Sequence, residues 1–215
     1  MSRFLSLFKA AKTKRDSLLK NTNALRLVNG IADDFPGLTL DQFGSHFQLQ
    51  FFTAELLAHK EDLIRSIVEI WNPSYLVSKY RLDPDGKKLE SPLIVTEIGE
   101  SLSSSTEVQE GQARFVVDLK DTINPGLFLD MRDIRIEIGS RSTSKTLLNL
   151  FSYTCSFAVH ARLGGATKVT NVDISSKILE KGRANYQLNG LTCLPGEFFK
   201  GSSFEYLEYA NKKGL

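Results

Sequence analysis

The chain has 215 residues, of which 41% are hydrophobic and 24% charged, and its formal net charge is +2. This composition excludes a disordered chain, and no apolar run reaches the length that spans a membrane. The charge is too small to indicate nucleic-acid binding by itself. The two cysteines lack metal-site spacing, and we find no secretory signal, so we expect a cytoplasmic protein without a metal site.

The first 23 residues are expected to form a basic amphipathic helix. Phe4, Phe8, Ala11 and Leu18 recur at helical spacing. Two interpretations of the opposite face stay open: it faces RNA and neutralises phosphates, or it is an ordinary solvated surface. The basic residues of that face are Arg3, Lys9, Lys12, Lys14, Arg15 and Lys20.

Residues 24–120 predict an α+β domain. Alternating apolar and polar residues indicate strands, and a longer amphipathic stretch indicates a helix ending at Trp71. A charged loop is expected over residues 82–91. The expected strands cover 25–29, 38–42, 46–53, 75–80, 93–98, 106–109 and 113–119, and the expected helix covers 54–71.

The next part of the chain alternates buried strands with helices. An apolar run over 146–151 precedes a short loop at 152–154, and a second apolar run over 168–172 ends at Asp173. This order predicts the first half of a nucleotide-binding, Rossmann-like α/β sheet. Helices are expected at 155–163, 177–188 and 203–213, and a third strand at 197–201. In one interpretation residues 131–138 also form an amphipathic helix, which covers the sheet.

Two details favour an adenosine ligand without phosphates. No glycine occurs between Asn149 and Leu163, whereas a pyrophosphate needs a glycine-rich loop to approach the backbone. Asp173 follows the second strand, where a carboxylate can accept both hydroxyls of a ribose. S-adenosylmethionine is the common ligand of this kind. Alternatively, Asp173 only caps the helix that follows.

Three ordered blocks of sequence carry a resemblance to a known family. They are Leu25-Arg-Leu-Val-Asn-Gly30 with Phe35-Pro-Gly-Leu-Thr-Leu-Asp-Gln-Phe-Gly44, then Leu127-Phe-Leu-Asp-Met-Arg132, and Asn149-Leu-Phe-Ser-Tyr-Thr154 with Gly164-Gly-Ala166 and Val172-Asp-Ile-Ser175. Together they resemble the bacterial ribosomal large-subunit methyltransferase I family. The resemblance implies a class I enzyme that uses S-adenosylmethionine to form 5-methylcytosine in large-subunit rRNA.

The resemblance also implies which residues hold the cofactor. Asp130 and Arg132 are expected at its amino-acid end, where they can meet its ammonium and carboxylate; the alternative is that Arg132 makes only a surface pair. Ser202 replaces the family's aspartate near the adenine. The other residues implied are Asn149, Phe151, Ser152, Tyr153, Thr154, Asp173 and Ile174.

Cys155 replaces a glycine of the family. If this position has a positive φ, a side chain there is strained. The family's nucleophilic cysteine lies further downstream, so we do not expect Cys155 to be catalytic.

These observations predict three segments: a basic helix (1–23), an α+β RNA-associated domain (24–120) and a partial Rossmann-like domain (121–215). From the resemblance we expect that this chain lacks the family's catalytic C-terminal half and that it is inactive by itself. The exposed edge of a half-sheet favours self-association, such as a homodimer. The alternative function is a noncatalytic RNA-binding or ribosome-assembly module that retains the fold.

Overall fold

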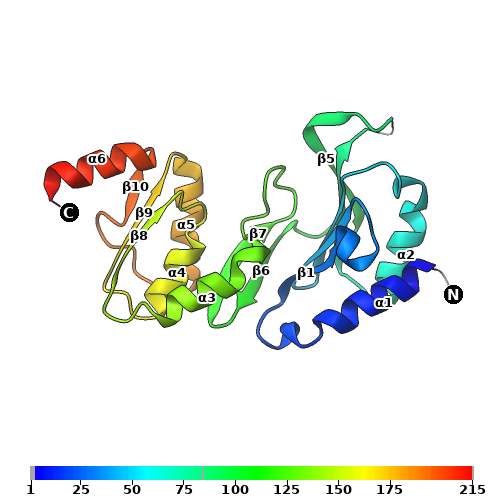
Figure 1. Cartoon of the computed structure of the whole chain (residues 1–215), viewed down its shortest axis with the longest axis horizontal. Coiled ribbons are helices and arrows are strands. Elements are labelled where there is room, and N and C mark those ends of the chain that lie inside the picture. The colour runs from blue at the N-terminus through cyan, green and yellow to red at the C-terminus, as the bar shows by residue number, and fades with distance from the viewer. Residues whose placement is uncertain (1–2, 84, 215) are drawn as a thin grey trace. The chain divides into compact units, whose positions relative to one another are not determined.

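The computed structural model describes residues 3–83 and 85–214 (Figure 1). The chain divides into two compact units, one formed by residues 1–109 and 117–125, the other by residues 110–116 and 126–215. This division differs from the expected boundaries after residues 23 and 120. The N-terminal helix belongs to the first unit, and a short segment that precedes residue 120 belongs to the second.

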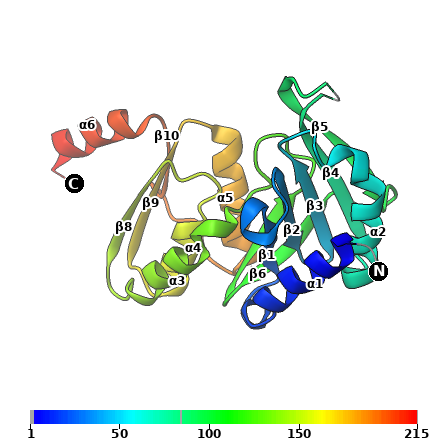
Figure 2. The same cartoon turned by 45° about the vertical axis from the view of Figure 1, so that its right-hand side comes forward.

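The first unit is built on a five-stranded sheet of order β1-β2-β3-β4-β5. The β3–β4 pair is parallel, and the other neighbouring strands are antiparallel. Helices α1 and α2 cover one face of this sheet (Figure 2). The elements are α1 (Arg3–Arg15), β1 (Ala24–Asn29), β2 (Leu38–Phe43), β3 (His46–Phe51), α2 (Lys60–Trp71), β4 (Tyr75–Leu82) and β5 (Lys88–Ile98), with 3-10 turns at Leu18–Lys20, Gly30–Asp33 and Leu57–His59.

The core of this unit explains the position of α1. Phe8 and Ala11 are fully buried and belong to the same hydrophobic cluster as Leu27, Leu40 and Leu63. The helix is therefore part of the domain that follows it. Because its apolar stripe is buried against the sheet, only its other face remains for a partner.

Two residues of the expected basic face have structural roles in the fold. Arg15 donates to both carboxylate oxygens of Asp33, and Lys14 donates to the same carboxylate at 3.1 Å. The Asp33 side chain is only 2% exposed, and that of Arg15 is 14% exposed. The expectation that Arg15 lies on an open basic surface is therefore wrong.

Two further boundaries differ from expectation. The helix expected from Ala54 begins at Lys60, after a 3-10 turn, and the acidic residues of its first turn mark this true start. The charged loop expected over 82–91 is shorter, because β4 continues to Leu82 and β5 begins at Lys88. The edge strand β5 tolerates Pro92, which has no N–H to donate.

The second unit carries a parallel sheet of order β10-β9-β8. Its elements are α3 (Arg132–Ser140), β8 (Thr146–Leu150), α4 (Ser156–Leu163), β9 (Lys168–Asp173), α5 (Ser176–Leu188), β10 (Phe198–Lys200) and α6 (Ser203–Lys213), with a 3-10 turn at Leu129–Met131. A separate two-stranded sheet is formed by β6 (Ser105–Glu110) and β7 (Ala113–Asp118). The expected α/β fold class, with an α+β part followed by a Rossmann-like half-sheet, is confirmed.

Helices cover both faces of the parallel sheet (Figure 1). The Asn149 and Asn171 side chains share the α5 side, where Asn171 donates to the Tyr186 hydroxyl at 3.2 Å. Val172 packs against α6 on the other side. The edge strand β8 has no neighbour on its other side within the described residues, and Leu148 on it is 42% exposed. No helix in the described part of the chain has the length and apolarity needed to cross a bilayer.

Candidate functional site

The loop between β8 and α4 has an unusual backbone. Phe151, Tyr153 and Cys155 all have positive φ values, of 52°, 48° and 61°. None of them is glycine, and such conformations cost a residue with a side chain free energy. Cys155, which replaces a glycine of the family, thus does lie at a position of positive φ. Strain of this kind persists only where surrounding contacts hold the backbone.

Asp173 supplies one of those contacts. Its Oδ2 atom accepts the backbone N–H of Tyr153, and its Oδ1 atom accepts the backbone N–H of Ser175, each at 3.0 Å. The helix that follows is capped by Ser175, whose side chain accepts from Ile178 N. The alternative that Asp173 is the helix cap is therefore wrong. Each carboxylate oxygen has capacity for a further hydrogen bond.

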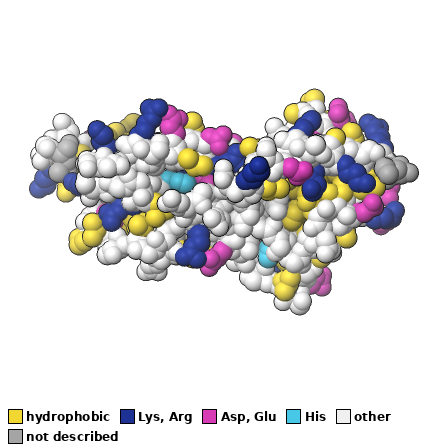
Figure 3. All heavy atoms as spheres, turned by 90° about the horizontal axis from the view of Figure 1, so that it is seen from below, with side chains coloured by type: hydrophobic (Ala, Val, Ile, Leu, Met, Phe, Trp, Pro, Cys, Tyr) yellow, Lys and Arg dark blue, Asp and Glu magenta, His cyan; other side chains and the backbone are white. Residues whose placement is uncertain are grey.

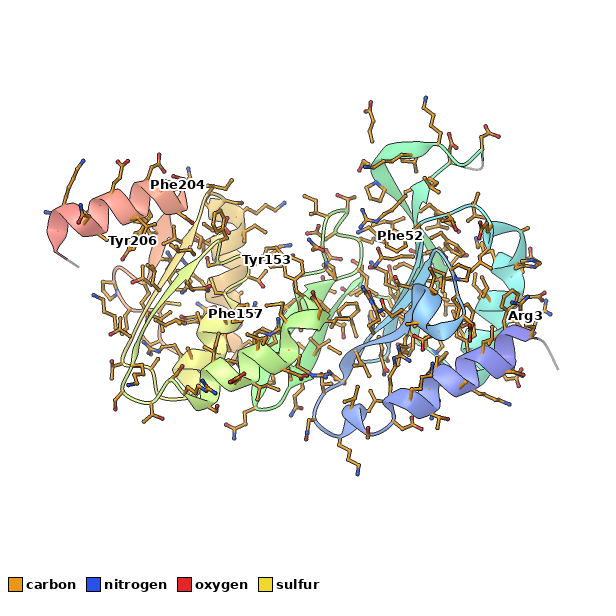
Figure 4. All side chains as sticks on the ribbon, in the orientation of Figure 1. Arg3, Phe52, Tyr153, Phe157, Phe204 and Tyr206 are labelled. Atoms are coloured by element: carbon orange, nitrogen blue, oxygen red, sulfur yellow. The ribbon has the colours of Figure 1, made fainter. Side chains whose placement is uncertain are left out.

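The loop is also held from α5 and by the backbone of β9. Asn185 Nδ2 donates to the Thr154 carbonyl at 3.0 Å, and Ser152 N donates to the Val172 carbonyl at 2.9 Å. Asn185 therefore ties the loop to α5. Figure 4 labels Tyr153 in the loop and Phe157 on α4, which directly follows it.

Cys155 is fully buried under the loop. Burial raises the pKa of its thiol to about 12, so the sulfur stays protonated at neutral pH. A thiol needs to become a thiolate to act as a nucleophile. The structure therefore agrees with the expectation that Cys155 is not catalytic. Gly182 of α5 leaves room for the sulfur, because any Cβ at that position would collide with Sγ.

The segment from Gly126 to Arg132 lies against the same loop. Thr154 Oγ1 donates to the Gly126 carbonyl at 2.6 Å, and the Phe128 and Tyr153 rings lie 5.2 Å apart between centroids. Asp130 is exposed in the 3-10 turn that precedes α3. The structure thus brings the two separate sequence blocks together through Gly126 and Phe128, which the sequence analysis did not name as contact residues.

Arg132 combines features of both interpretations made from sequence. Its Nε atom donates to Asp133 Oδ1 at 3.0 Å, which is a local surface pair. Its side chain is nevertheless only 14% exposed, and its Nη1 atom is buried without a hydrogen-bond partner among the described residues. A buried guanidinium N–H without an acceptor is costly, so the position suits an anionic ligand group.

The remaining predicted residues divide into two groups. Phe151 and Ile174 are 75% and 71% exposed. Phe151 directly follows β8 and Ile174 directly follows β9, so both lie at the carboxyl edge of the sheet. Asn149 instead points to the α5 side and donates to Asn171 at 2.9 Å. The Ser202 hydroxyl oxygen caps α6 by accepting from Glu205 N, so part of its expected acceptor capacity is already used.

Comparisons with known proteins agree with this arrangement. Residues 69–207 match the family model for S-adenosylmethionine-dependent methyltransferases. The chain belongs to this methyltransferase family. YwbD of Bacillus subtilis is 33% identical over 99% of this chain and 54% of its own length. Ribosomal RNA large subunit methyltransferase I of Aeromonas salmonicida is 31% identical over 98% of this chain and 54% of its own length.

Among solved structures, that of SMU.776 complexed with SAH has a TM-score of 0.88 and 27% identity to the chain. It covers 99% of this methyltransferase-family chain, which in turn covers 55% of SMU.776. The chain thus spans about half the length of the relatives it matches. The resemblance to the ribosomal large-subunit methyltransferase I family that the three sequence blocks indicated is confirmed.

Proposed function

We propose that this chain binds S-adenosylmethionine and contributes to methyl transfer to RNA, with large-subunit rRNA as the substrate. The observation that carries the proposal is the Asp173 carboxylate at the end of β9, held by the N–H groups of Tyr153 and Ser175. An acceptor fixed in this way suits two ribose hydroxyls, because its oxygens keep unused lone pairs. When bound, the cofactor supplies an electrophilic methyl group on its sulfonium sulfur.

The residues present fit the ligand at its other end too. The Nη1 atom of Arg132 is buried and has no hydrogen-bond partner in the described part of the chain, which supports contact with the carboxylate of an amino acid. Asp130 is exposed two residues earlier and suits an ammonium group. Phe151 and Ile174 offer exposed apolar side chains next to Asp173 for the faces of an adenine. Tyr153 and Thr154 hold the loop, and Ser202 can contact the adenine edge through its hydroxyl proton.

RNA as substrate is supported by the printed names of relatives, among them ribosomal RNA large subunit methyltransferase I. Lys and Arg side chains are spread over the face in Figure 3 rather than gathered in one block. Exposed basic residues of α1, such as Arg3 and Lys9, are the proposed contribution of the N-terminal helix to phosphate binding. We also propose a cytoplasmic location and self-association through the open edge of β8.

The proposal is tested by equilibrium dialysis of the chain with radiolabelled S-adenosylmethionine. We expect displacement by S-adenosylhomocysteine and none by NAD, because the loop has no glycine-rich site for a pyrophosphate. Filter binding then compares large-subunit with small-subunit rRNA. Retention of RNA without any cofactor binding would favour the noncatalytic RNA-binding module instead.

A further inference from the structure

A buried cluster of three charged or titratable residues lies in the second unit, outside the proposed contact residues. Glu110 and Arg135 have no exposed side-chain surface, and the His160 side chain is 8% exposed. The Arg135 Nε and Nη2 atoms donate to the two Glu110 carboxylate oxygens at 2.7 and 2.6 Å. His160 Nε2 lies 3.0 Å from Glu110 Oε1.

The protonation of this cluster is determined by its contacts. Burial raises the pKa of Glu110, but hydrogen bonds from Arg135 and His160 outweigh burial and hold that pKa below its usual value. Glu110 is therefore an ionised carboxylate at neutral pH. It accepts all three contacts, so His160 carries its proton on Nε2.

One N–H group of Arg135 donates to a residue outside the cluster. Its Nη1 atom donates to the backbone carbonyl of Phe128 at 2.9 Å, just before the turn that carries Asp130. The guanidinium is planar, so pairing two of its N–H groups with Glu110 fixes the direction of the third. Arg135 also lies over the Phe157 ring, with Cζ 5.9 Å from the centroid, which fixes the guanidinium from a further side.

Stability alone does not account for such a cluster. Replacing a buried ion pair with apolar residues of similar volume is often neutral or stabilising. The Glu110–Arg135 pair does what apolar residues cannot: it supplies a directed donor to one carbonyl. Thr154 holds the neighbouring Gly126 carbonyl, so the segment that leads to Asp130 and Arg132 is held at two carbonyl groups.

We propose that Glu110, Arg135 and His160 are positioning residues that set the geometry of Asp130 and Arg132 and so select ligands that carry an amino-acid group. This inference rests on the proposed function, since it assumes that Asp130 and Arg132 meet the amino-acid end of the cofactor. The cluster touches no ligand itself. Its expected effect is therefore selective, and it is confined to one end of the ligand.

Two ligands distinguish binding at the amino-acid end of the cofactor from binding at its adenosine end. S-adenosylhomocysteine and 5′-methylthioadenosine share the adenosine thioether, and only the first carries an amino-acid group. Arg135→Lys keeps the charge beside Glu110 but loses the planar fork. We expect it to weaken S-adenosylhomocysteine binding roughly tenfold, the effect of one misaligned charge-assisted contact, and to leave 5′-methylthioadenosine binding unchanged.

The chain offers a matched control. Arg162 Nη1 pairs with Glu197 Oε1 at 2.7 Å, and its side chain is 15% exposed; within the described residues no hydrogen bond or ion pair joins this pair to the Gly126–Arg132 segment. Arg162→Lys should leave both affinities unchanged. His160→Gln is a milder test, because it loosens Glu110 while Arg135 keeps its bond to Phe128; we expect a smaller, equally selective loss.

The outcomes are distinct. If Arg135→Lys weakens both ligands equally, or neither, the positioning role is overturned. Should that variant fail to fold by circular dichroism, a folded His160→Gln protein with unchanged selectivity overturns it instead. If the unmutated chain binds neither ligand, the proposed function itself fails, and the inference fails with it.

Discussion

The Asp173 carboxylate accepts the backbone N–H of Tyr153 at 3.0 Å, which joins the end of β9 to the loop that follows β8. The bond holds a residue with a φ of 48° in a loop with two more positive φ values. Because the loop has no glycine, its conformation depends on such contacts.

Removing the carboxylate should therefore release the loop. In Asp173→Ala we expect the Tyr153 amide to exchange with solvent about tenfold faster, since one charge-assisted hydrogen bond is worth about 1.5 kcal/mol or more. Hydrogen–deuterium exchange measured by NMR tests this. Glu180→Ala, on an exposed side chain of α5, should leave the Tyr153 amide unchanged. Equal exchange in all three proteins would refute the anchoring role.

Cys155 gives a second test of loop geometry. Its φ of 61° suits glycine, and its side chain fills a fully buried space beside Gly182. A β-branched side chain is strained in this conformation, so Cys155→Val should lower the free energy of unfolding by about 2 kcal/mol or more. Cys155→Gly loses packing but relieves the backbone strain, so it should change the free energy of unfolding less. Urea denaturation ranks the variants, and a more stable valine variant would contradict the account.

The ion pairs of Asp33 predict a pH dependence. Burial raises the pKa of Asp33, but hydrogen bonds from Arg15, Asn29 and Lys14 outweigh it and lower the pKa overall. A lowered folded-state pKa contributes stability above the unfolded value of about 3.9, and this stability is lost as pH falls through the folded value. The contribution is thus complete at pH 7 and disappears in acid.

Asp33→Asn should remove that contribution. We expect it to destabilise the protein at pH 7 by about 3 kcal/mol, because Arg15 and Lys14 lose their charged partner, and to destabilise it less near pH 3. Urea unfolding at both pH values measures the difference. Asp16→Asn, in an exposed pair with Lys12, is the control and should have little effect. An equal loss of unfolding free energy at both pH values would show that the charge of Asp33 is not the cause.

The open edge of β8 predicts self-association. Leu148 is 42% exposed there, and a groove of about 350 Å³ lies beside the strand. Its lining combines the apolar Ile134, Ile138 and Leu147 with polar and charged residues, among them Glu137, Arg141 and Lys145. Unpaired strand edges with apolar neighbours favour pairing with a second chain. Light scattering should show a mass that rises with concentration, and Leu148→Lys should reduce it. A monomer at all concentrations would show that this edge is not used.

The sequence predicted the second unit better than the first. The run of strands and helices after Thr146 was found because each apolar run ends at a loop or glycine turn. The start of α2 was missed because Leu56 and Leu57 continue its apolar spacing while the chain forms a 3-10 turn. The beginning of β5 was missed because an edge strand can carry charges and a proline.

The arrangement of the candidate site residues could be inferred from sequence only where they lie close together in the chain. Tyr153, Thr154 and Asp173 lie within one strand–helix–strand stretch, at the carboxyl ends of its two strands, so their positions could be inferred from the order of the elements. Glu110 and His160 lie 50 residues apart in the sequence, and only folding brings the imidazole of His160 into contact with the carboxylate of Glu110. Nothing in the local sequence distinguishes Arg135 from a surface arginine, and tertiary packing alone buries it.

Calorimetric titration of the chain with S-adenosylmethionine decides whether Asp173 holds the ribose of this cofactor. We expect saturable one-to-one binding that Asp173→Ala weakens by about 2 kcal/mol or more, because two ribose hydroxyls lose a charged acceptor. Glu180→Ala should bind as the unmutated chain does. No binding by a sample that circular dichroism shows to be folded, or equal binding by Asp173→Ala, would contradict this role of Asp173.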